Sequence, residues 1–192
     1  MSHRLRTFIA VDVAPFTRDR LKGLQSQLAA IGGSVRWVEP GNLHVTLLFI
    51  GEVDPRETPK ICQAVADAVK SIASFEFNVA GLGAFPTPRR PRILIAKIDQ
   101  GADGLKQLHE AIEPGIMDLG GYRREERPFT PHVTLGRISR DADADSLAGA
   151  IAKFEVWTGG QTRVREVRVM ASQLRSEGPE YSVLSRAKLL GS

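Results

Sequence analysis

The sequence predicts an α+β fold made of two pseudo-symmetric lobes, and three observations carry that prediction. The segment His-Val-Thr-Leu occurs at residues 44–47 and again at 132–135, so the second copy begins 88 residues after the first. Each copy lies in an apolar run typical of a strand, and a helical pattern precedes it. The interval from Ile9 to His44 is 35 residues, and that from Ile95 to His132 is 37. Strand, helix and histidine strand thus recur at nearly equal spacing, which indicates a degenerate internal duplication.

The first half begins with an apolar strand at residues 8–13. Pro15 then opens a helical pattern that ends at Gly32 and Gly33, because proline suits the first turn of a helix and glycine suits its end. The remaining elements of this half are a brief strand at 35–38, a turn at 40–42, the first histidine strand at 43–50 ending at Gly51, and a helix at 58–73.

The second half repeats this order. A strand at 75–85 ends the first half, and a turn rich in proline and arginine at 86–92 joins it to the strand at 93–98, with which the second half begins. The elements that follow are a helix at 102–119 ending at Gly120 and Gly121, a charged loop at 122–127, the second histidine strand at 133–138 behind Pro128 to Pro131, a helix at 144–153, and strands at 164–170 and 181–189 around a turn at 176–179.

A parallel, doubly wound fold is the competing architecture. We place it second, because the strands at 75–85 and 93–98 follow one another with no helix between them. A glycine-rich phosphate loop is also missing, since Gly81-Leu82-Gly83 lacks the third glycine and the helix behind it. We therefore expect one domain over residues 1–192 with mainly hairpin-like strand pairs.

Composition narrows the function classes. The formal charge of +4 and the sequence pI of about 9.5 favour anionic partners without proving that nucleic acid is bound. Cys62 is the one cysteine, which excludes an internal disulfide and a cysteine metal cluster, and its helical surroundings indicate packing. No run approaches the ~20 apolar residues of a membrane span. We expect no membrane association, a cytoplasmic location and a monomer.

Each repeated motif places an imidazole and a hydroxyl on one face of a strand, because residues i and i+2 point the same way. His44 with Thr46 and His132 with Thr134 would supply a general base, a general acid and two hydroxyl donors. Such a set suits attack on phosphorus without a metal, and neither motif has the carboxylate or cysteine neighbours that zinc requires. Inherited scaffolding is the alternative, but histidine is a poor scaffold residue in an apolar strand, since its burial requires a partner.

The other candidates are sorted by position. Arg137 and Phe49 each lie five residues after a motif histidine, an odd offset that strict alternation places on the opposite face unless a bulge intervenes. His3 and His109 are given no catalytic role. The arginines of two loops either form solvated faces or line a phosphate groove: Arg89, Arg90 and Arg92, then Arg123, Arg124 and Arg127.

The paired motifs and their flanks resemble the two-histidine phosphoesterase superfamily, in particular the bacterial and archaeal RNA 2′,3′-cyclic phosphodiesterases, also called LigT-like proteins or 2′-5′ RNA ligases. The resemblance covers nearly the whole chain. Four segments carry it besides the motifs: Arg36-Trp37-Val38-Glu39-Pro40-Gly41-Asn42-Leu43, Pro128-Phe129-Thr130-Pro131, Gly81-Leu82-Gly83-Ala84-Phe85-Pro86 and Gly178-Pro179-Glu180-Tyr181-Ser182-Val183-Leu184.

The resemblance implies a bilobal α+β fold, with antiparallel sheets around a central cleft that holds both histidines and with helices on the outside. It implies metal-independent, cofactor-free hydrolysis of an RNA 2′,3′-cyclic phosphate end, as on tRNA fragments, to a 2′-phosphate. By analogy His132 is the general base and His44 the general acid. Thr46, Thr134 and Arg137 would hold the phosphate, and Phe49 would contact the terminal nucleoside. The reverse reaction would join two RNA ends through a 2′-5′ linkage.

Two alternatives stay open. One is a phosphodiesterase of the same superfamily that acts on another substrate, either a nucleotide cyclic phosphate or a 2′-5′ oligonucleotide. The other is an RNA-binding module without catalysis. The residues alone do not distinguish the acid from the base, because the two motifs are alike.

Overall fold

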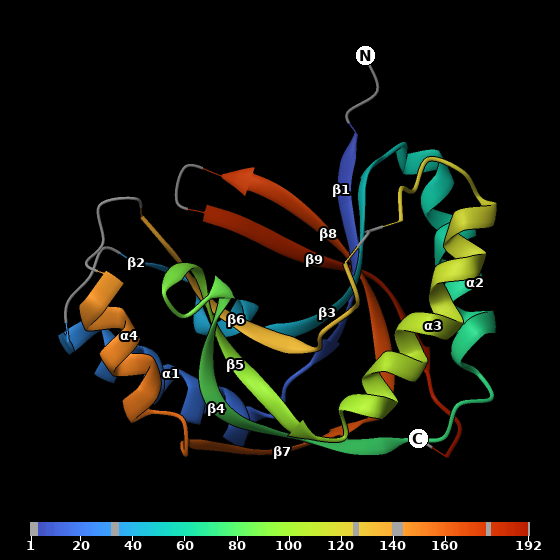
Figure 1. The fold of residues 1–192 in the computed structure, drawn as a ribbon. Coiled ribbons are helices and arrows are strands. Elements are labelled where there is room, and N and C mark those ends of the chain that lie inside the picture. The colour runs from blue at the N-terminus through green and yellow to red at the C-terminus, as the bar shows by residue number, and fades with distance from the viewer. Residues whose placement is uncertain (1–3, 32–34, 125–126, 140–143, 176–177, 192) are drawn as a thin grey trace.

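The computed structural model describes residues 4–31, 35–124, 127–139, 144–175 and 178–191 (Figure 1). His3, Gly32, Gly33, two residues of the charged loop at 122–127 and part of the predicted turn at 176–179 lie outside these ranges.

The described residues form nine strands and four α-helices. The strands are β1 (Leu5–Asp12), β2 (Val35–Trp37), β3 (His44–Val53), β4 (Phe75–Thr87), β5 (Arg90–Gln100), β6 (His132–Ile138), β7 (Thr158–Val164), β8 (Glu166–Arg175) and β9 (Gly178–Lys188). The helices are α1 (Pro15–Ile31), α2 (Thr58–Val69), α3 (Ala102–Asp118) and α4 (Ala144–Lys153). Short 3-10 turns lie at Pro40–Asn42 and Pro55–Glu57.

Several bounds differ from the expected ones: α2 ends at Val69 and not at residue 73, and β8 begins at Glu166 and continues to Arg175. Three further differences concern the strands. Strand β7 was not predicted, because its two glycines and polar residues give no clear alternation. The first histidine strand does not stop at Gly51, which adopts a φ of 93° and lets β3 continue to Val53. The turn predicted at 86–92 is shorter, since β4 and β5 stay paired as far as Thr87 and Arg90.

All nine strands belong to one sheet, in the order β7-β4-β5-β6-β3-β1-β8-β9, with β2 pairing the free part of β6. Every pair in this sheet is antiparallel, so the competing parallel fold is wrong and the α+β prediction is confirmed. The two halves of the chain exchange strands: β4 pairs with β5, while β8 and β9 extend the sheet from β1. The lobes therefore meet where β3 pairs with β6.

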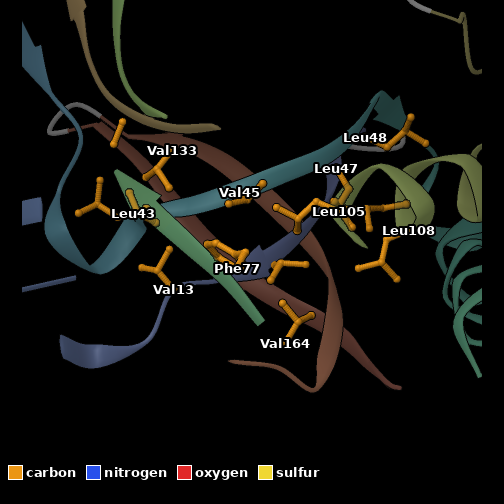
Figure 2. Close-up of a cluster of buried hydrophobic side chains, with 14 of the residues drawn as sticks. Val13, Leu43, Val45, Leu47, Leu48, Phe77, Leu105, Leu108, Val133 and Val164 are labelled. Atoms are coloured by element: carbon orange, nitrogen blue, oxygen red, sulfur yellow. The ribbon is translucent and has the colours of Figure 1, made fainter. Parts of the chain in front are cut away.

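The helices form two pairs on either side of the molecule, α1 with α4 and α2 with α3 (Figure 1). They cover the apolar face of the curled sheet. Val45, Leu47 and Val133 from the motif strands join Leu105 and Leu108 of α3 in this buried cluster (Figure 2). The motif valines and leucines thus anchor the strands, and they leave the alternate positions for the other face.

Cys62 lies partly buried on α2 and packs against the core, as expected. Among the described residues, no helix combines the length and the apolar character needed to cross a membrane.

Candidate functional site

The two motifs lie side by side in the sheet. Strands β3 and β6 pair antiparallel with Val45 opposite Val133, and both valines are fully buried. In an antiparallel pair the flanking positions also oppose each other, so His44 faces Thr134 and Thr46 faces His132. These four half-buried side chains share the face opposite the helix-packed valines. The structure therefore brings the two predicted histidine–threonine pairs together.

Each histidine is anchored in the same way. Nδ1 of His44 lies 2.7 Å from the carbonyl oxygen of Asn42, and Nδ1 of His132 lies 2.7 Å from that of Thr130. Since a carbonyl oxygen only accepts, Nδ1 carries the hydrogen in both rings. Nε2 is then the atom available for proton transfer, and that of His44 lies 2.9 Å from Thr46 Oγ1.

Aromatic rings enclose His44. The ring of Phe8 on β1 stacks on it with 5.1 Å between centroids, and Tyr181 on β9 meets it edge-on at 5.7 Å. Burial lowers the pKa of His44, an effect opposed by its bond to Asn42 and by the charge of Asp12, while His132 adds to the lowering. The pKa of His44 therefore depends on its burial and on these neighbouring groups.

Asp12 stands directly opposite His44 in the β1–β3 pairing. Its Oδ1 accepts a hydrogen bond from Arg18, and its Oδ2 lies 2.7 Å from an amino group of Arg168. Two arginines thus hold the carboxylate in place beside the acid candidate.

His132 has a different setting. Phe85 on β4 contacts it edge-on at 4.9 Å, and Lys97 on β5 stands opposite it in the strand register. Burial lowers the pKa of His132, and the bond to the Thr130 carbonyl opposes that shift.

A bulge in each motif strand turns Phe49 and Arg137 onto the histidine face. In β3, Ile9 pairs with Leu48 and Ala10 with Thr46, so Leu47 is unpaired with β1. In β6, Leu135 is skipped in the same way against β5. The extra residue reverses the alternation beyond it. Consistent with this, Phe49 lies 6.2 Å from Phe8 between ring centroids, and the charge of Arg137 opposes the rise in the pKa of Tyr181 caused by burial.

Sequence reasoning missed the residues that other strands contribute: Phe8, Asp12, Lys97 and Tyr181. Spacing along the chain does not reveal them, because each is brought in by strand pairing. Of these four, Tyr181 carried a signal, since it lies in one of the segments on which the resemblance rests; Phe85, which contacts His132, lies in another.

His109, which was given no catalytic role, makes structural contacts. His109 bonds through Nδ1 to the carbonyl oxygen of Leu47 at 2.8 Å and stacks on Phe129 at 4.5 Å, so it braces the β3 bulge. Arg124, one of the loop arginines, forms an ion pair of 2.8 Å with the buried Glu113. Within the described part of the chain, no three His, Cys, Asp or Glu side chains gather as metal ligands would.

Known proteins are similar in sequence to most of the chain. The model of the 2′-5′ RNA ligase superfamily matches residues 18–175. A Methanothermobacter thermautotrophicus protein named RNA 2′,3′-cyclic phosphodiesterase is 32% identical over 179 residues, which cover 93% of this chain and 96% of that protein. An Archaeoglobus fulgidus protein of the same name is 32% identical over 180 residues, covering 94% of this chain and 98% of its own length.

Solved structures share the fold. A Thermus thermophilus crystal structure superposes with a TM-score of 0.82 at 29% identity, covering 97% of this chain and 99% of that one. The crystal structure of Escherichia coli LigT complexed with 3′-AMP gives a TM-score of 0.77 at 22% identity, covering 98% of this chain and 99% of that one. At that identity the second match speaks for the fold alone.

Proposed function

Because the chain belongs to the 2′-5′ RNA ligase superfamily, we propose that it hydrolyses RNA 2′,3′-cyclic phosphate ends to 2′-phosphates. One observation carries the proposal: two histidine–threonine pairs face one another across the β3–β6 pair, and in each histidine Nδ1 is held by a backbone carbonyl, which leaves Nε2 as the atom that can transfer a proton. The names of the curated relatives at about one-third identity support the same substrate class.

The proposed reaction needs one base and one acid. Nε2 of His132 takes a proton from water as the water oxygen attacks phosphorus. The bond from phosphorus to the 3′-oxygen breaks, and His44 gives its Nε2 proton to that oxygen. The phosphate stays on the 2′-oxygen, and the two histidines end with their protonation states exchanged. Acid–base catalysis of this kind contributes about 10²–10⁴-fold.

The surroundings of the histidines favour this division of roles. Burial has the largest influence on the pKa of His44 and lowers it; the charge of Asp12, which faces this ring, opposes that lowering and so helps the ring to carry the proton an acid must give. Burial lowers the pKa of His132, which keeps its ring neutral and ready to accept a proton. Burial lowers the pKa of both rings, so the assignment of His44 as acid and His132 as base rests on the analogy, and the carboxylate beside His44 is the one difference that favours it.

The remaining site residues would hold the substrate. Thr46 and Thr134 flank the line between the histidines, so hydroxyl donors reach two phosphate oxygens, and Arg137 neutralises their charge. Phe49, with 59% of its surface exposed beside Phe8, offers a flat face to the terminal nucleoside. We also propose that the enzyme is a monomer, that it acts in the cytoplasm and that it needs no metal or cofactor. It would further catalyse the reverse reaction, 2′-5′ ligation of RNA ends.

A metal-free assay tests the proposal. The protein is incubated in EDTA with a short RNA that ends in a 2′,3′-cyclic phosphate, and 2′- and 3′-phosphate products are resolved. Hydrolysis to the 2′-phosphate alone is the expected result. If the protein turned over only a nucleotide cyclic phosphate or a 2′-5′ oligonucleotide, that compound and not the RNA end would be its substrate. If it bound RNA in a salt-sensitive way and formed no product, it would be an RNA-binding module without catalysis.

A further inference from the structure

Strand β2 brings a second arginine to the face of the site. In the β2–β6 pairing, Arg36 stands directly opposite Arg137. Its neighbours Val35 and Trp37 pack against the core, and a Cβ on Gly136 would meet a methyl carbon of Val35 at 2.6 Å. Since side chains alternate along a strand, Arg36 points away from the core, onto the face that carries His132, Thr134 and Arg137. Arg36 is exposed there.

The strand that carries Arg36 is firmly held. The backbone nitrogen of Val38 bonds to the Leu135 carbonyl oxygen at 2.9 Å. The buried side chain of Gln25 on α1 donates to the carbonyl oxygens of Val38 and Leu135, at 2.8 and 2.9 Å. The position of Arg36 is therefore fixed by the fold rather than by a loose loop.

The guanidinium groups of Arg36 and Arg137 place two positive charges on neighbouring strands. Like charges directly opposite one another in a sheet are destabilising. Within the part of the chain that the structure describes, no ion pair with a carboxylate is found for Arg36 or for Arg137, although other arginines near the site, such as Arg18 and Arg168, are neutralised by Asp12. An anion with two charges to share, or two neighbouring anions, would relieve this repulsion.

The place of Arg36 in the sheet indicates which anion it meets. Arg137 follows the bulge after Thr134 and stands next to the proposed reacting phosphate. Arg36 lies on β2, which pairs with the end of β6 beyond Thr134, along the edge that β3 occupies at Val133, so Arg36 is further along the site from the histidines. A cyclic mononucleotide has a single phosphate, which the histidines, threonines and Arg137 would already occupy. An RNA chain presents a second phosphate one nucleotide away.

We propose that Arg36 binds the internucleotide phosphate next to the reacting one, and that it thereby makes the site prefer an RNA chain to a cyclic mononucleotide. This inference rests on the proposed function, because it deepens the substrate class of the same site. Arg36 would contribute to substrate binding and not to the chemical step.

Equilibrium binding of product-type ligands tests the inference apart from turnover. The ligands are a trinucleotide ending in a 2′-phosphate and the matching nucleoside 2′-phosphate, each titrated at several salt concentrations. Arg36→Ala is compared with Arg36→Lys, which keeps the charge, and with Lys22→Ala, which removes an equal charge from the exposed side of α1. Thermal unfolding of each variant establishes that the fold is retained.

Arg36→Ala is expected to weaken trinucleotide binding about tenfold, the loss of one charge-assisted contact. Binding of the nucleoside 2′-phosphate should stay within about twofold, and the salt slope for the trinucleotide should shrink by about 0.7, as for one phosphate of a single strand. Arg36→Lys should retain most of the affinity, and Lys22→Ala should match the wild type.

Two results would overturn the inference: equal weakening of both ligands, which would place Arg36 on the reacting phosphate, or no weakening of either. Failure of the proposed function looks different. In that case the wild type would bind the trinucleotide through Arg36 and yet hydrolyse no RNA cyclic phosphate.

Discussion

The two histidine strands are alike in backbone and different in surroundings. Each histidine bonds through Nδ1 to the carbonyl oxygen two residues before it, and each strand bulges at the leucine three residues after it. Beyond the bulge the copies diverge, because Phe49 occupies in β3 the position that Arg137 occupies in β6.

The neighbours diverge further. His44 lies among Phe8 and Tyr181 and opposite Asp12, whereas His132 meets Phe85 and stands opposite Lys97. The repeated motif sets the geometry that the two strands share, and the adjoining strands give each copy its own charged and aromatic neighbours. Equivalent backbone positions in the two strands thus have different electrostatic surroundings.

Removal of either histidine should have the largest effect. His44→Ala and His132→Ala each remove one proton-transfer group, and we expect kcat to fall about 10²–10⁴-fold on an RNA cyclic phosphate with the unfolding transition retained. His109→Ala is the matched control: it should lower the free energy of unfolding by about 1–3 kcal/mol, because it leaves the Leu47 carbonyl without its partner, while kcat stays near the wild-type value. Near-normal turnover in either motif variant would refute the two-histidine mechanism.

Loss of Arg137 should come next in size. Arg137→Ala removes charge stabilisation beside the reacting phosphate, and a fall of about 10²-fold in kcat/KM is expected. Arg137→Lys should recover part of this loss, since it keeps a charge but not the forked geometry. A variant with unchanged kcat/KM on both mononucleotide and RNA substrates would remove Arg137 from the site.

Loss of Phe49 should act on binding instead of chemistry. Phe49→Ala removes the exposed ring that we place under the terminal nucleoside, so KM should rise about tenfold with kcat little changed. Phe16→Ala, at another exposed phenylalanine on α1, should leave both constants unchanged. If Phe49→Ala lowered kcat as far as Arg137→Ala does, Phe49 would not be limited to substrate binding.

Asp12 gives the smallest expected effect, visible as a shift along the pH axis. Its negative charge raises the pKa of His44, while burial and His132 lower it. Asp12→Asn should therefore lower that pKa, and the alkaline limb of the kcat/KM profile, which reports the essential acid, should move to lower pH. The groups that face this pair are Arg18 from α1, Arg168 from β8 and the ring of Tyr181 from β9.

Glu166→Gln is the control for this experiment. It disturbs the same charge network through Arg168, at 2.8 Å, without facing His44. The limb should stay in place in that variant. If Asp12→Asn left the alkaline limb of the kcat/KM profile in place, Asp12 would have no effect on the pKa of the catalytic acid.

The sequence predicts the fold and the motif pair because its signals there are local or repeated. Pro15 marks the start of α1, and the duplicated segment marks both histidine strands. It does not reveal Asp12, Phe8 or Tyr181, since these reach the site through pairing of strands that lie far apart along the chain. The bulges left only a faint trace in the sequence, two consecutive non-polar residues at Leu47-Leu48 and at Leu135-Gly136.

The division of roles between the two histidines has a direct test. A cyclic phosphate substrate with sulfur in place of the bridging 3′-oxygen needs no proton on its leaving group, because a thiolate is a far weaker base than an alkoxide. His44→Ala should regain most of its lost kcat on this substrate, whereas His132→Ala should stay as impaired as on the oxygen substrate. Rescue of His132→Ala instead, or equal rescue of both variants, would contradict the assignment of His44 as acid and His132 as base.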